Sequence, residues 1–358
     1  MKKLLALLLS GTMILGLAAC GGNSDPTPTP EGGGDVTPAA TVTGNVMIYT
    51  SMYENVIETL DEVLEKKFPD CNIEFFYGGT GTLQQKVAAE MDSGKLGCDM
   101  LMVAEPAYSL ELKEKGVLHA YKSPEAENLS FDYDAEGYWY PVRVCTMVLA
   151  YNPDLYQPED LATTFEEFAT KPELKGYISM GNPLSSGTTM AAIVALQDAY
   201  GTEYFTNLGK QNVTVESGSV ALTKLETGEC KEVMILEESV LTKRENEGSE
   251  LAVIYPEDGT ICIPSTIMTV NDDWNANQNT EACQAITDWF LSPEGQQYII
   301  QAWMHHVRKD MTDQFPYDSK PKAEVFAKTI DVDWERCYKE RDSIRTAFEE
   351  NVTIPEKK

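Results

Sequence analysis

The sequence is poor in basic residues and in histidine. Lysine and arginine total 28 against 57 aspartate and glutamate residues, so the formal net charge is −29. Only three histidines are present. Because binding to nucleic acid needs a basic surface, this charge balance excludes nucleic acid as a partner. An acidic surface favours solubility and says little about a small ligand.

Motifs of metal binding and catalysis are missing as well. None of the eight cysteines forms a C-x-x-C pair, and several lie in apolar runs, so we expect mostly free thiols and no metal site. The sequence lacks G-x-S-x-G, H-E-x-x-H and the G-K-[ST] of a nucleotide P-loop. We therefore expect no cofactor and no enzymatic activity. A secreted phosphate-ester hydrolase is the alternative that a phosphatase assay would test.

Long apolar runs are absent except at the N-terminus, where Lys2 and Lys3 precede an apolar stretch over residues 4–17. This pattern predicts a signal peptide over residues 1–19. It ends in LAAC, which resembles the bacterial lipoprotein box and implies lipid on Cys20. Residues 20–44 are rich in glycine, proline and threonine, which favours a flexible tether. We expect an extracytoplasmic protein that is lipid-anchored to the bacterial cell membrane.

The rest of the chain alternates short apolar runs with helical patterns. NVMIYTS, NIEFFYGG and CDMLMVAEPAY read as strands, and ENVIETLDEVLEKKF repeats apolar residues at a helical period. This βαβαβα order predicts an α/β fold with a mostly parallel sheet flanked by helices, and a second, similar unit begins after VLAYNPDLY, residues 148–156. We expect two lobes: residues 45–145 with 265–310, and residues 146–264 with 311–355.

Small hydroxyl residues stand at corresponding strand-to-helix turns of the two halves. Ligands of such sheets bind at the carboxyl ends of strands, here at Ser51, at GGTGT (residues 78–82) and at Glu105. The second half has SSGTT, residues 185–189. Hydroxyls and free backbone N–H groups at a helix start suit an anion, although either motif alone can be ordinary helix capping. The candidate ligand residues from the two motifs are Thr80, Gly81, Thr82, Ser185, Ser186, Gly187 and Thr188.

Four charged residues near strand ends have two interpretations. Glu105, Glu237 and Glu238 are either solvated surface charges or acceptors for ligand hydroxyl or ammonium groups. Arg143 either binds an anionic group or forms a structural ion pair near the crossing between the lobes.

The ordered landmarks resemble a known group of exported proteins. The run from VMIYTSMYENV to ELKEKGVL, followed by VLAYNPDL, NPLSSGTTMAAIVAL, YPEDGT, WFLSPEGQQYI and DVDWERCYKERDSI, is similar to bacterial extracellular solute-binding proteins of the ferric-iron, phosphonate and sugar-phosphate type. The resemblance covers about residues 45–350. It implies a two-lobed, periplasmic-binding-protein-like fold of type II with a hinge crossing. It also implies a monomer that delivers a solute to the membrane subunits of an ABC permease.

The resemblance leaves the solute open. Iron-binding members hold ferric ion with two adjacent tyrosines after the strand that here reads KEVMILEES, where this chain has Glu237 and Glu238. SSGT resembles the phosphate-contacting turn of the organic-phosphate binders. We therefore expect a small organic phosphate or phosphonate, such as a sugar phosphate or aminoethylphosphonate. Ferric iron or a ferric chelate is the alternative.

Overall fold

The computed structural model describes residues 42–275, 279–312 and 320–354, and every structural statement here concerns these residues. They belong to a unit formed by residues 36–358. The predicted signal peptide, Cys20 and the tether up to residue 41 lie outside the described residues, so these predictions stay untested.

The first part of the described chain has the predicted βαβαβα order. Its elements are β1 (Gly44–Thr50), α1 (Glu54–Lys67), β2 (Cys71–Tyr77), α2 (Thr80–Asp92), β3 (Met100–Ala104) and α3 (Pro106–Glu114). Helix α1 buries Val56, Leu60, Val63 and Leu64, the apolar stripe expected of a helix that covers a sheet. The short strand β4 (Leu118–His119) follows, and then the long strand β5 (Tyr140–Tyr151), whose residues are all buried.

The second part repeats the alternation with more helices. Its elements are α4 (Phe165–Thr170), β6 (Ile178–Gly181), α5 (Gly187–Tyr200), α6 (Glu203–Lys210), β7 (Thr214–Glu216), α7 (Gly218–Thr227), β8 (Glu232–Leu236), α8 (Glu237–Glu247), β9 (Ala252–Ile254) and β10 (Ile261–Val270). Helix α5 is apolar on all sides and its first ten residues are buried, so it lies in the core. Sequence reasoning overlooked β7 and α7 and extended β8 through residue 239. The structure corrects this boundary, because α8 begins at Glu237.

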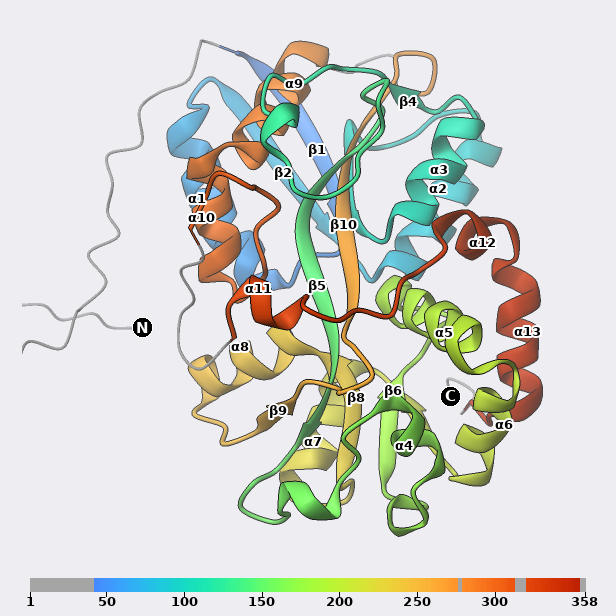
Figure 1. Cartoon of the computed structure of the whole chain (residues 1–358). Coiled ribbons are helices and arrows are strands. Elements are labelled where there is room, and N and C mark those ends of the chain that lie inside the picture. Colours follow the sequence, from blue (N-terminus) through green and yellow to red (C-terminus); the bar gives the residue numbers. More distant parts are fainter. Residues whose placement is uncertain (1–41, 276–278, 313–319, 355–358) are drawn as a thin grey trace, which may run out of the picture. The chain divides into compact units, whose positions relative to one another are not determined.

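The strands form one mixed sheet in the order β2-β1-β3-β10-β5-β8-β6-β7, with β4 beside β10 and β9 beside β5. Two groups are parallel: the first strand group, β2-β1-β3, and the second strand group, β8-β6-β7. The antiparallel strands β10 and β5 join them, and both run lengthwise through the sheet (Figure 1). This architecture confirms the predicted α/β class.

The remaining helices are α9 (Thr280–Leu291), α10 (Pro293–Gln301), α11 (Lys322–Val325), α12 (Trp334–Lys339) and α13 (Arg341–Asn351). Ser292 separates α9 from α10, and its hydroxyl caps α10 by accepting from the Gly295 N–H at 3.2 Å. No described helix is long and apolar enough to cross a membrane. The seven cysteines in the described residues are all free, as expected, and all but Cys262 are buried.

Candidate ligand-binding cleft

A cleft of about 710 Å³ is lined by residues that follow strands of both strand groups and by one face of β5. The helix starts of α2, α5 and α7 line it, together with residues along α8 from Ser239 to Glu247 and one face of β5. Residues Arg143, Cys145 and Met147 of β5 all line the cleft, because alternate residues of a strand point to the same side. The two motifs expected to bind an anion therefore open into one cavity.

The starts of α2 and α5 are in direct contact. The Gly81 N–H donates to the Ser185 carbonyl at 3.1 Å. A Cβ atom on Gly81 would lie 2.7 Å from the Leu184 carbonyl oxygen, and one on Gly187 would lie 2.9 Å from the Thr80 Cβ. Real side chains do not tolerate such distances, so glycine at both positions allows this close approach.

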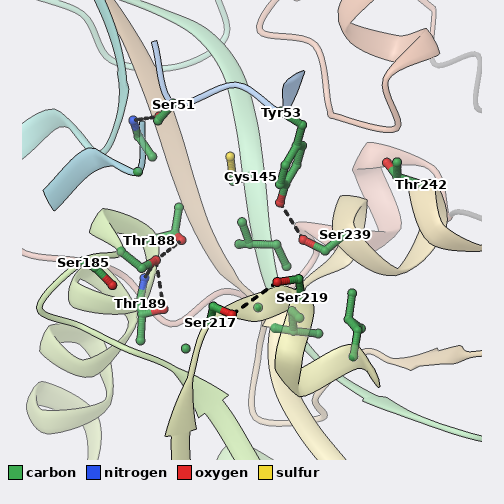
Figure 2. Close-up of a pocket in the computed structure, with 18 of the residues that line it drawn as sticks. Ser51, Tyr53, Cys145, Ser185, Thr188, Thr189, Ser217, Ser219, Ser239 and Thr242 are labelled. Carbon is green, nitrogen blue, oxygen red and sulfur yellow. Dashed lines mark hydrogen bonds between the residues drawn. The ribbon is translucent and has the colours of Figure 1, made fainter. Parts of the chain in front are cut away.

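A chain of hydroxyl groups organises the start of α5. The Ser186 hydroxyl accepts from both the N–H (3.2 Å) and the hydroxyl (3.0 Å) of Thr189, and lies 3.0 Å from the Thr188 hydroxyl. With both lone pairs of Ser186 used, its own proton goes to Thr188, which leaves the Thr188 proton free for a ligand. Figure 2 shows Thr188 and Thr189 in this chain, with Ser185 beside them and Ser51 on the same side of the cleft.

Arg143 brings a buried positive charge to the same place. Its side chain is 2% exposed. One terminal nitrogen lies 2.8 Å from the Met304 sulfur, and the other donates to the Ser51 carbonyl at 3.4 Å. The guanidinium Nε has no hydrogen-bond partner, and no carboxylate of the described residues forms an ion pair with Arg143. The sequence left two interpretations of Arg143 open, an anionic ligand or a structural ion pair. The described residues do not show the structural ion pair.

The predicted glutamates do not line the cleft, and all three are buried rather than solvated. Glu105 caps α3 by accepting from the Tyr108 N–H at 3.2 Å and lies 3.7 Å from Arg341. Burial outweighs Arg341 and raises the pKa of Glu105 to about 8. Glu237 accepts from the Tyr255 hydroxyl and contacts His305 Nε2 at 2.8 Å. Burial also raises the pKa of Glu238, and the positive charge of Arg143 partly opposes this shift.

The remaining predicted residues divide between cleft and surroundings. Seven line the cleft: Ser51, Thr80, Arg143, Ser185, Ser186, Gly187 and Thr188. Gly81 lies behind the cleft against a smaller cavity of about 210 Å³, and Thr82 is exposed elsewhere. The structure thus brings the two helix starts and Arg143 together and leaves the carboxylates out.

Sequence reasoning missed the other side of the cleft. Ser217 and Ser219 stand at the start of α7, and Ser239 and Thr242 belong to α8. Tyr53 follows β1, and its hydroxyl lies 2.6 Å from the Ser239 hydroxyl (Figure 2). Burial raises the pKa of Tyr53, so its phenol stays protonated. The sequence ESGSV, residues 216–220, is another run of small hydroxyl residues at a helix start, and it could have indicated this part of the cleft.

The sequence profile of the bacterial extracellular solute-binding proteins matches residues 98–334, more than half of the chain. The chain belongs to this family. No curated protein sequence matches it. Across the described residues, no group of three or more histidine, cysteine, aspartate or glutamate side chains is placed to hold a metal ion.

Solved structures share the fold at low identity. The periplasmic binding protein AfuA from Actinobacillus pleuropneumoniae, with exogenous fructose-6-phosphate bound, has a TM-score of 0.74 at 20% identity, covering 88% of this chain and 100% of its own. Iron-bound HitA from Pseudomonas aeruginosa has a TM-score of 0.72 at 19% identity, covering 86% and 99%. The substrate-binding protein of an ABC transporter from Agrobacterium tumefaciens has a TM-score of 0.75 at 18% identity, covering 87% and 95%. These likenesses show a periplasmic-binding-protein fold, as expected.

Proposed function

We propose that this solute-binding protein captures a small organic anion, a phosphate monoester or a phosphonate, and delivers it to the membrane subunits of an ABC importer. The family membership and the fold support the receptor role, since solute-binding proteins of this type serve transport. We expect no enzymatic activity.

Arg143 carries the proposal. Its guanidinium lines the cleft, and the residue is only 2% exposed. Because it has no ion-pair partner in the described structure, its positive charge is left unbalanced. Keeping an unpaired charge out of water is costly unless a ligand supplies the counter-charge. Thr80, Thr188 and the N–H groups of two helix starts surround the same space and suit the oxygens of a phosphate group.

Isothermal calorimetry of wild type and Arg143→Met against sugar phosphates, aminoethylphosphonate, inorganic phosphate and ferric citrate tests the proposal. Hydrogen bonds to charged groups contribute about 1.5–3 kcal/mol each, so Arg143→Met should weaken phosphate-ester or phosphonate binding by about tenfold or more. Arg336→Met, outside the cleft on α12, serves as the matched control and should bind like wild type. Equal affinity of Arg143→Met and wild type would rule the proposal out.

Ferric iron, alone or as a chelate, is the second candidate. One observation favours it: two phenol groups, those of Tyr53 and Tyr77, line the cleft. The neighbour HitA is iron-bound. A bare ferric ion beside Arg143 would experience charge repulsion, so Arg143→Met should not weaken its binding. A visible phenolate-to-iron absorption band after ferric loading, with no affinity for phosphorylated compounds, would favour iron.

We further propose that the protein is a monomer attached through lipid on Cys20, with the predicted tether ending before β1 begins at Gly44. Cys20→Ala should leave the fold intact and move the protein from the membrane fraction to the soluble fraction. Continued fractionation of this variant with membranes would contradict lipid attachment.

A further inference from the structure

The hydroxyl groups of the cleft stand in two places. Figure 2 shows Ser51, Ser185, Thr188 and Thr189 on one side and Tyr53, Ser239 and Thr242 on the other, with Ser217 and Ser219 between them at the base. The first side includes the proposed anion contacts. The second side and the base together form what we call the hydroxyl wall, which consists of Tyr53, Ser217, Ser219, Ser239 and Thr242.

Every charged residue of the described cleft lining except Arg143 has an ion-pair partner. Besides Arg143, its charged lining residues are Glu216, Lys243 and Glu247. Glu216 pairs with Lys224 at 2.6 Å, and Lys243 pairs with Glu247 at 2.5 Å and with Glu226 at 3.2 Å. Glu237 and Glu238, which the sequence analysis considered as acceptors for ligand hydroxyl or ammonium groups, do not line the cleft. Nothing in the described lining therefore offers an unpaired negative charge to an amine.

The hydroxyl wall has hydrogen-bonding capacity left over. The Thr242 hydroxyl oxygen is buried and has no hydrogen-bond partner in the described residues, an arrangement that costs free energy unless a ligand satisfies it. Tyr53 and Ser239 share one proton between two hydroxyls 2.6 Å apart, so the other proton is available to an acceptor. The cleft volume of about 710 Å³ falls in the range of organic-ligand pockets, roughly 300–1,000 Å³.

We propose that the solute carries one anionic group and an uncharged, polyhydroxylated second end, which the hydroxyl wall binds through Tyr53, Ser239 and Thr242. This inference rests on the proposed function and narrows it. It favours a monophosphorylated sugar or polyol over an aminoalkylphosphonate, whose ammonium meets no unpaired carboxylate. It also disfavours a bisphosphate, whose second dianion meets no second unpaired cation among the described residues.

Calorimetry with a matched set of ligands tests the inference: a hexose 6-phosphate, n-hexyl phosphate, 2-aminoethylphosphonate and a hexose 1,6-bisphosphate. A site that hydrogen-bonds hydroxyls discriminates strongly against analogues that lack them. The hexose 6-phosphate should bind at least tenfold more tightly than each of the other three. Hexyl phosphate binding as tightly as the hexose phosphate, or aminoethylphosphonate binding more tightly, would overturn the inference while leaving an organic phosphate or phosphonate as the solute.

A variant pair tests the residues. Ser239→Ala with Thr242→Val should remove most of the preference for hexose 6-phosphate over hexyl phosphate, whereas Thr227→Val, on α7 outside the cleft lining, should keep it. Thermal unfolding checks that both variants fold. An undiminished preference in the double variant would contradict the role of the hydroxyl wall. If no phosphorylated compound binds and ferric citrate does, the proposed function itself fails.

Discussion

Single buried charges are the features of this molecule with the largest expected consequences. Arg143 on β5 is the clearest, since a buried guanidinium without an ion pair in the described residues needs a counter-charge. Glu232 is a second case. It is 0% exposed at the start of β8, one carboxyl oxygen accepts from the Ala162 N–H at 3.1 Å, and the other has no hydrogen-bond partner in the described residues.

Glu232 makes stability depend on pH. Burial raises its pKa from 4.5 to about 8, so the folded state keeps a proton that the unfolded chain loses above about pH 4.5. The stabilisation is complete below pH 4.5 and is lost as the pH rises towards 8, by about 1.4 kcal/mol per pH unit. Urea unfolding between pH 5 and 8 should show a flatter decline for Glu232→Gln than for wild type. The exposed Glu173→Gln is the control, and an unchanged slope in Glu232→Gln would contradict the assignment.

Helix starts make up most of the site at the scale of elements, and they differ in how tightly they pack. Gly187 and Gly218 occupy the first position of α5 and α7. A Cβ on Gly187 would lie 2.8–3.0 Å from Thr80 and the Ala104 carbonyl, whereas one on Gly218 would meet only the Ile235 side chain at 3.7 Å. The contact between α5 and α2 is therefore tight, and the start of α7 has open space.

This difference predicts opposite effects of one substitution. Gly187→Ala should lower the free energy of unfolding by about 1–3 kcal/mol, because overpacking moves the two helix starts apart, and should weaken ligand binding. Gly218→Ala should leave stability unchanged or slightly higher, since alanine favours helix. Urea unfolding of both variants tests these two predictions. Equal stability changes would mean that the starts of α2 and α5 are not packed against each other in solution.

Sequence patterns predicted these elements unevenly. GGTGT and SSGTT were predictable as helix starts, because small residues follow apolar strands there; Ser186 caps α5, and Gly79 stands at the N-cap of α2. The starting point of α7 was missed because β7 has only three residues. Glu237 and Glu238 were expected either to be solvated or to accept hydrogen bonds from the ligand. Helix α8 begins at Glu237, however, and its first turn directs both side chains into the protein. Because the strand ends and the helix begins at adjacent residues, the sequence pattern did not reveal the boundary between them.

At the scale of the whole described chain, contacts cross between the two strand groups on both sides of the cleft. Tyr53 follows β1 and meets Ser239 of α8, and the Gly81 N–H binds the Ser185 carbonyl. On the far side of α3, Arg341 of α13 pairs with Glu111 at 2.6 Å. We propose that the lobes predicted from the sequence, residues 45–145 with 265–310 and 146–264 with 311–355, close on the solute through such contacts.

Closure links solute binding to stability. A ligand that contacts Arg143 and the hydroxyl wall together binds the closed, folded state and not the unfolded chain. At a hundredfold excess over Kd, the free energy of unfolding should rise by about 2.7 kcal/mol. Small-angle scattering should show a smaller radius of gyration with the hexose phosphate than without it. Arg143→Met at the same ligand concentration should show a smaller rise, about 1.4 kcal/mol if its Kd is tenfold weaker. Stabilisation without compaction in wild type would mean that the solute binds a cleft that is already closed, and the two-lobe proposal would fall.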